Sequence, residues 1–137
     1  DYTFRYVYSE HVMLDNLLKA NNRNKMAFEY LMAFYLLAKR PDKIVENLRR
    51  LDDFGCHEIP RHYEEAILIH TDVTGQEVPL GERRITPQTI ERFNDFVNRC
   101  RPRQNQGQVD MVALARDFGD SYWFYFVFGR SAAGGSP

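Results

Sequence analysis

Apolar residues recur along most of this chain at the spacing of one face of an α-helix. Residues 12–18, 44–51 and 90–97 each place apolar side chains three or four positions apart, which is the period of a helix face. Proline or glycine separates the apolar segments, and proline is well tolerated in the first turn of a helix. The pattern therefore predicts an all-α fold with helices near residues 9–20, 25–39, 41–54, 60–74, 86–101, 109–118 and 121–128.

The segment 25–39 differs from the others because it is apolar around almost its whole circumference. A helix without a polar face has to be covered on several sides. We therefore expect this helix at the centre of the domain. Asn24 stands just before it and is a residue type that caps helix N-termini through its side-chain oxygen.

The segment 24–54 resembles a tetratricopeptide repeat. Large residues occupy the packing positions of the first helix, and aliphatic residues occupy those of the second: Phe28, Leu31, Tyr35, Ile44, Leu48 and Leu51. The repeat normally has small residues where Met32 and Ile44 stand here, so the copy is degenerate. The resemblance implies antiparallel helical hairpins stacked as a short, degenerate tetratricopeptide-like array, with residues 60–100 as a second, irregular unit.

Length and charge limit the classes of function. With 137 residues, the chain fits a single domain, which we expect over residues 1–130, followed by a mobile tail over 131–137. The 18 basic and 19 acidic residues are balanced, which argues against a nucleic-acid partner. Arginines gather between residues 83 and 103, and a solvated helix face and loop accounts for them.

The chain begins with Asp1 rather than Met, so we expect it to be part of a longer protein. Its longest apolar run, residues 26–38, is shorter than the roughly 20 residues that a membrane-spanning helix needs. The isolated domain is therefore expected to be soluble.

The residues that could carry chemistry are few. Residues 56–58 (Cys, His, Glu) and His62 are of metal-binding types, but their spacing does not place two ligands on one helix face. His62, Glu65 and His70 could serve acid–base chemistry, although no paired nucleophile accompanies them in the sequence. We predict no catalytic residue, no metal site and no cofactor.

Residues 122–128 hold six of the chain's 19 aromatic residues. Three interpretations are open: a buried closing helix, an interface to a partner or to the rest of the protein, and contact with a membrane surface, where Trp and Tyr are enriched. The residues that we predict for an interaction surface are Arg23, Tyr30, Phe34, Tyr122, Trp123 and Tyr125.

Three segments, 28–33, 59–66 and 118–124, together resemble the C-terminal soluble domain of an uncharacterised family of Bacteroidetes-type membrane proteins. The resemblance implies a parent protein in a bacterial inner membrane, with this domain on the extracytoplasmic (periplasmic) side. It brings no catalytic residues with it.

The leading functional hypothesis is a non-catalytic protein-interaction or scaffold domain. Its partner would be another protein or the remainder of its own full-length chain. Two alternatives stay open: an accessory domain of a membrane enzyme acting on lipid-linked sugars, and a small hydrolase using the His62 region. The sequence does not indicate an oligomeric state.

Overall fold

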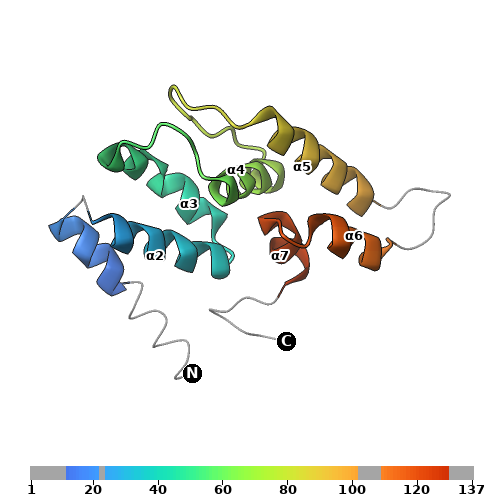
Figure 1. The fold of residues 1–137 in the computed structure, drawn as a ribbon, viewed down its shortest axis with the longest axis horizontal. Coiled ribbons are helices and arrows are strands. Elements are labelled where there is room, and N and C mark those ends of the chain that lie inside the picture. Colours follow the sequence, from blue (N-terminus) through green and yellow to red (C-terminus); the bar gives the residue numbers. More distant parts are fainter. Residues whose placement is uncertain (1–11, 22–23, 102–108, 130–137) are drawn as a thin grey trace, which may run out of the picture. The chain divides into compact units, whose positions relative to one another are not determined.

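The computed structural model describes residues 12–21, 24–101 and 109–129. Within these ranges every regular element is a helix (Figure 1), which confirms the predicted all-α class. The described residues form two compact units, one ending at Glu58 and the other covering Ile59–Gly129. The prediction of a single domain over residues 1–130 stays a prediction, and the predicted tail lies outside the described residues.

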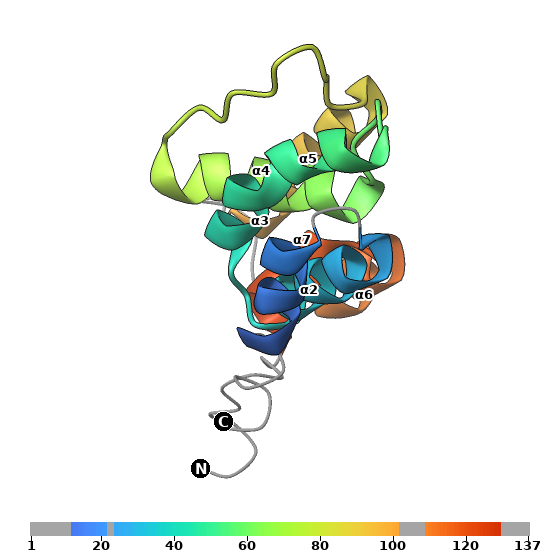
Figure 2. The ribbon, with the colours of Figure 1, turned by 90° about the vertical axis from the view of Figure 1, so that its left-hand side faces the viewer.

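The first unit contains a helix over residues 12–20, followed by α2 (Lys25–Leu37), α3 (Pro41–Asn47) and the 3₁₀ helix η1 (Leu48–Phe54). Helices α2 and α3 pack against each other, as Figures 1 and 2 show. The apolar side chains in the core of this unit are Leu18, Ala27, Phe28, Leu31, Met32, Tyr35, Ile44, Leu48 and Leu51.

Local sequence signals explain most of the boundaries in the first unit. The side chain of Asn24 accepts a hydrogen bond from the backbone N–H of Ala27 at 3.1 Å, so the predicted cap is confirmed. Pro41 stands in the first turn of α3, and Gly55 ends η1 with a left-handed φ of 66°. A left-handed residue closes a helix end with little strain when it is glycine.

Two helix ends differ from the prediction. The helix expected over 41–54 tightens into a 3₁₀ helix at Leu48. Helix α2 ends at Leu37 instead of Lys39, because Lys39 adopts a left-handed φ of 57°. That conformation lets the backbone N–H of Arg40 donate to the carbonyl of Tyr35 at 2.9 Å, which satisfies one of the last carbonyls of the helix.

An ion pair connects the 12–20 helix to η1. Arg50 lies 3.4 Å from the carboxylate of Asp15, and Lys19 lies 3.1 Å from it. Burial raises the pKa of Asp15, but hydrogen bonds and charges from Lys19 and Arg50 outweigh this effect and leave the pKa lowered. Burial, with a smaller effect of the nearby Asp15 charge, raises the pKa of Tyr35 to about 12, so its hydroxyl stays neutral in the core.

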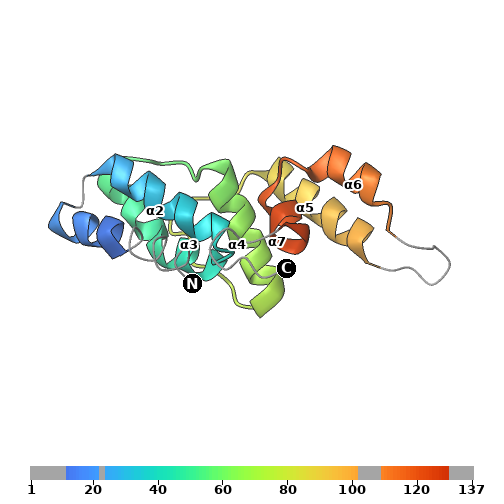
Figure 3. The same ribbon diagram turned by 90° about the horizontal axis from the view of Figure 1, so that it is seen from below.

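The second unit contains α4 (Arg61–Thr74), α5 (Pro87–Cys100), α6 (Met111–Phe118) and α7 (Tyr122–Phe128). Helix α4 packs against α5 and α7, and α6 packs against α5 and α7, as can be followed in Figure 3. A long non-helical connection over residues 75–86 joins α4 to α5. The apolar core residues are Ile59, Tyr63, Ala66, Ile67, Ile69, Phe93, Phe96, Leu114, Phe118, Tyr122 and Trp123.

Helix α2 is covered on one side only by the residues that the structure describes. One side is buried in the core of the first unit, but Met26, Tyr30 and Leu37 are 66%, 62% and 50% exposed. Cover on several sides is therefore not seen for this face among the described residues. Among the described helices, none is long and apolar enough to cross a membrane.

Candidate functional site

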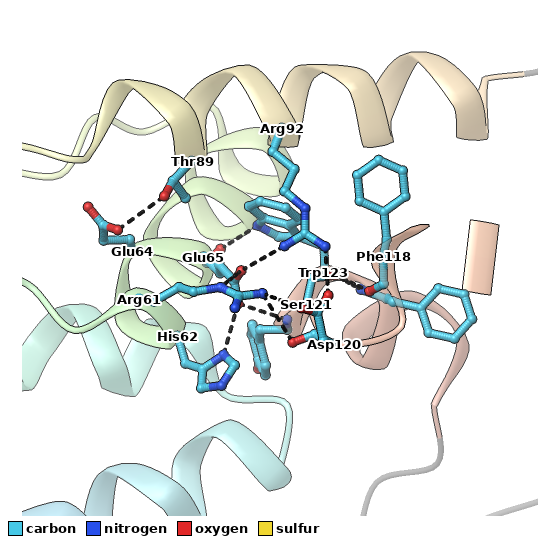
Figure 4. Close-up of polar contacts among 12 residues, drawn as sticks. Arg61, His62, Glu64, Glu65, Thr89, Arg92, Phe118, Asp120, Ser121 and Trp123 are labelled. Atoms are coloured by element: carbon cyan, nitrogen blue, oxygen red, sulfur yellow. Dashed lines mark hydrogen bonds and ion pairs between the residues drawn. The ribbon is translucent and has the colours of Figure 1, made fainter. Parts of the chain in front are cut away.

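The most connected polar side chain in the second unit is the carboxylate of Glu65, on the first turns of α4. Glu65 is 0% exposed. Its Oε1 accepts a hydrogen bond from the backbone N–H of Tyr122 at 3.0 Å and lies 2.9 Å from Nδ1 of His62. Its Oε2 accepts from Nε of Arg61 at 3.1 Å (Figure 4). A buried carboxylate is stable only with such donors, because burial removes its hydration.

Asp120 forms an outer layer on the same network. Arg61 donates to one carboxylate oxygen of Asp120 at 3.0 Å, and Arg92 donates to the other at 2.6 Å. Arg92 also lies 3.9 Å from Oε2 of Glu65. Hydrogen bonds from Arg92 and then Arg61 lower the pKa of Asp120 to about 2. We call Arg61, His62, Glu65, Arg92 and Asp120 the Glu65 cluster. Its two arginines balance its two carboxylates.

The Glu65 cluster rests on an aromatic core. Trp123 is fully buried, and its Nε1 donates to the backbone carbonyl of Glu65 at 2.9 Å. The ring centroid of Trp123 lies 5.1 Å from that of Phe93. The guanidinium of Arg92 lies over the ring of Phe118, 5.3 Å from its centroid, a geometry that attracts a cation to the ring face. Polar and aromatic contacts thus hold α4, α5 and α7 together at one place.

Glu64, the neighbour of Glu65, is also buried but makes a separate set of contacts. Its carboxylate accepts from the backbone N–H of Thr86 at 2.6 Å and from the hydroxyl of Thr89 at 3.2 Å. Glu64 therefore joins α4 both to the end of the long connection and to the first turn of α5. Thr86 directly precedes α5, but its side chain makes no capping hydrogen bond.

The structure unites only part of the predicted acid–base group. His62 and Glu65 are in contact, but the lone pairs of Glu65 already accept from Tyr122 and Arg61. His70 lies about two turns beyond His62 on α4 and is half-buried. In the part of the chain that the structure describes, no group of three His, Cys, Asp or Glu side chains could hold a metal ion.

The arginine-rich stretch is also partly committed to structure. Arg92 belongs to the Glu65 cluster, and Arg99 donates to the carboxylate of Asp117 at 2.7 Å. Hydrogen bonds from Arg116 and then Arg99 lower the pKa of Asp117 to about 2. Ion pairs within the second unit thus engage Arg92 and Arg99 of the arginine-rich stretch.

The residues predicted for an interaction surface divide into three groups. Tyr30 is exposed, whereas Phe34 and Tyr125 are half-buried. Tyr122 and Trp123 lie in the core of the second unit, so the structure corrects their assignment to a surface. Their burial agrees with a closing helix for the start of the aromatic run, while its last two residues, 127 and 128, are exposed. Arg23 lies outside the described residues.

The exposed side of α2 forms a continuous apolar line. Met26, Tyr30, Ala33 and Leu37, which we call the α2 stripe, are all exposed. They are separated by four, three and four positions, so they follow one line along the helix. The only charged residues of α2, Lys25 and Glu29, lie beside this line and pair with each other at 4.0 Å. An apolar line therefore runs along the exposed side of α2, beside one exposed ion pair, where polar residues are usual.

Comparison with known protein families gives a match for this chain. A family profile matches residues 2–129, which is nearly the whole chain. The chain belongs to this family, described as "Family of unknown function (DUF6057)". The family description names no activity. No curated protein and no solved structure matches the chain.

Proposed function

We propose that this chain is a non-catalytic protein-interaction or scaffold domain of a larger protein, and that the α2 stripe is its contact surface. The observation that carries the proposal is the apolar exposed face of α2, where Met26 and Tyr30 are each more than 60% exposed. Exposed apolar side chains that form a continuous face on a soluble protein are typical of interaction sites.

The Glu65 cluster supports a structural role for the second unit. A general base needs a lone pair directed at the substrate, whereas Glu65 uses its oxygens to hold Tyr122 and Arg61. The positions of Arg61 and Arg92 between two carboxylates likewise leave them engaged within the unit. This arrangement favours a rigid support over a reactive site.

We further propose that α2 and α3 form a tetratricopeptide-like helical hairpin. The six residues that the resemblance assigns to packing positions are all buried: Phe28, Leu31, Tyr35, Ile44, Leu48 and Leu51. Contact between α2 and α3 supports this interpretation. Stacked repeats bind partners on an extended concave surface, which in a tetratricopeptide-like array is built by the first helix of each hairpin; α2 is the first helix of this hairpin and carries the α2 stripe.

Site-specific photo-crosslinking in cells that produce the full-length protein tests the proposal. A photoreactive amino acid replaces Tyr30 in one variant and Val112 in a matched control. Val112 is an 81% exposed apolar residue on α6. We expect position 30 to give a defined crosslinked product, identified by mass spectrometry, and position 112 to give little. Equal or absent crosslinking at the two positions would contradict the proposed function.

A further inference from the structure

We propose that the partner of the α2 stripe is the α2 stripe of a second copy of this chain, packed in the antiparallel direction. The inference rests on the proposed function and names the partner of the same surface. It is carried by the spacing, the side-chain sizes and the charge of the exposed α2 residues.

The spacing of the stripe indicates that its occupant is a helix. Intervals of four, three and four residues are the a and d positions of a heptad, at which two helices pack side by side. The buried face of α2 already packs within the first unit through Phe28, Leu31 and Tyr35. The stripe is thus a second packing seam on the same helix, on the side opposite to the core.

The side chains of the stripe fit those of a second stripe that runs in the opposite direction. An antiparallel pair with its two-fold axis between residues 31 and 32 places Met26 opposite Leu37 of the second copy. It also places Tyr30 opposite Ala33 of the second copy, so a large ring meets a small side chain twice. A parallel pair would place Tyr30 against Tyr30 and Ala33 against Ala33, which combines crowding with a gap.

Charge and helix direction agree with this arrangement. Lys25 and Glu29 pair within one helix, so the edge of the stripe is close to neutral and does not select a strongly charged partner. Antiparallel helices also align their dipoles favourably. A two-fold interface uses the same surface on both chains, which is the commonest form of self-association.

The interface would be small. From Met26 to Leu37 the stripe rises about 16 Å along the helix axis. Small interfaces generally give weak and reversible complexes. We therefore expect a monomer–dimer equilibrium that responds to protein concentration rather than a permanent dimer.

Analytical ultracentrifugation of the full 137-residue chain over a wide concentration range tests the inference. We expect wild type to self-associate and Tyr30→Glu to weaken dimerisation by about tenfold or more, because a charge then enters the seam. The control Val112→Glu should associate like wild type. Circular dichroism verifies that both variants stay helical. A monomeric wild type, or a Tyr30→Glu variant that dimerises normally, overturns the inference.

Disulfide crosslinking tests the direction of the pair. In a background with Cys56→Ser and Cys100→Ser, proteins carrying Met26→Cys and Leu37→Cys are mixed and oxidised. The antiparallel pair predicts that the mixed disulfide exceeds both disulfides between identical variants. Dominant Met26→Cys self-crosslinking would instead show a parallel pair and overturn the antiparallel arrangement.

The two proposals fail in distinguishable ways. If wild type stays monomeric while the photoreactive group at position 30 captures a different protein, the second-copy inference is wrong and the proposed function stands. If Tyr30→Glu abolishes binding to anionic phospholipid vesicles and wild type stays monomeric, the stripe contacts a membrane and both proposals are wrong. If position 30 crosslinks nothing and wild type is monomeric, both proposals are wrong.

Discussion

Asp120 and Glu65 perform different tasks although both are carboxylates held by Arg61. Glu65 is fully buried and joins α4 to the start of α7. Asp120 is largely exposed and places its charge between two arginines. The buried carboxylate of Glu65 therefore helps to set the contact between α4 and α7. The exposed carboxylate of Asp120 adds ion pairs with Arg61 and Arg92 to this contact.

Asp120 gives a prediction about acid stability. Its folded-state pKa of about 2 is below the ordinary value of about 3.9. The stabilisation is therefore present above about pH 4 and is lost as the pH falls through 2. We expect Asp120→Asn to lower the free energy of unfolding at neutral pH by no more than about 1 kcal/mol, since solvent screens this exposed pair.

Urea unfolding between neutral pH and pH 2, followed by tryptophan fluorescence, measures this effect. Asp120→Asn should lose less stability than wild type between pH 4 and pH 2. Asp72→Asn, an exposed carboxylate on α4, is the control and should follow wild type. The same acid dependence for wild type and Asp120→Asn would contradict a lowered pKa for Asp120.

The sequence indicates part of this site at the residue scale. His62 and Glu65 stand out by residue type, and their spacing of three residues on a helix predicts their contact. The contacts of Glu65 with Tyr122 and Trp123 lie 57 and 58 residues away, and no local pattern encodes them. Glu64 was missed because an acidic residue in a first turn usually faces solvent.

At the scale of single helices, a left-handed backbone conformation follows the end of α2. Lys39 has a left-handed φ of 57°, a conformation that costs a residue with a Cβ atom more than it costs glycine. The neighbouring contact of Arg40 with Tyr35 and the start of α3 at Pro41 maintain it. The end of α2 therefore stores a small amount of backbone strain.

Replacing Lys39 tests this strain. We expect Lys39→Gly to be more stable than Lys39→Ala by about 0.5–1 kcal/mol, because only glycine relieves the left-handed conformation. The alanine variant is the matched control, since both variants lose the lysine side chain. Thermal unfolding monitored by circular dichroism gives the comparison. An alanine variant as stable as the glycine variant would show that the position is not strained.

Helix signals with a defined chemical role were readable from the sequence. Asn24 caps α2 as expected, and Pro41 and Gly55 stand at helix ends, as proline and glycine between apolar segments predict. Ser121 is a residue type that favours helix starts, and its side chain accepts from the backbone N–H of Phe124. The 3₁₀ turn at Leu48 and the early end of α2 follow from tertiary packing and from a left-handed lysine, which have no such signal. The exposed side of α2 could not be read from the sequence, because an apolar composition does not tell which side of a helix its neighbours cover.

At the scale of the whole molecule, the division into two compact units has a natural reporter. The chain contains one tryptophan, and Trp123 is buried in the second unit beside Phe93. Its fluorescence therefore follows the unfolding of the second unit, whereas circular dichroism follows the helices of both.

Two matched core substitutions use this reporter. Ile44 and Ile67 are buried in the first and the second unit, and truncation to alanine at such positions costs about 2–5 kcal/mol. We expect Ile67→Ala to shift the tryptophan transition in urea. Ile44→Ala should shift mainly the circular-dichroism transition and leave the tryptophan transition near its wild-type midpoint. Equal shifts of the tryptophan transition would show that the two units unfold together.

The contact between Glu65 and Tyr122 also bears on the order in which the protein is made. Ribosomes synthesise chains from the N-terminus at a finite rate, so α4 emerges with its carboxylate 57 residues before the amide that it holds. Until α7 has left the ribosome, Glu65 has only its neighbours Arg61 and His62 and the surrounding water as partners, and α7 cannot complete the core of the second unit. A nascent chain interrupted within the α5–α6 region would therefore lack the amide of Tyr122 and leave this side of Glu65 open to water.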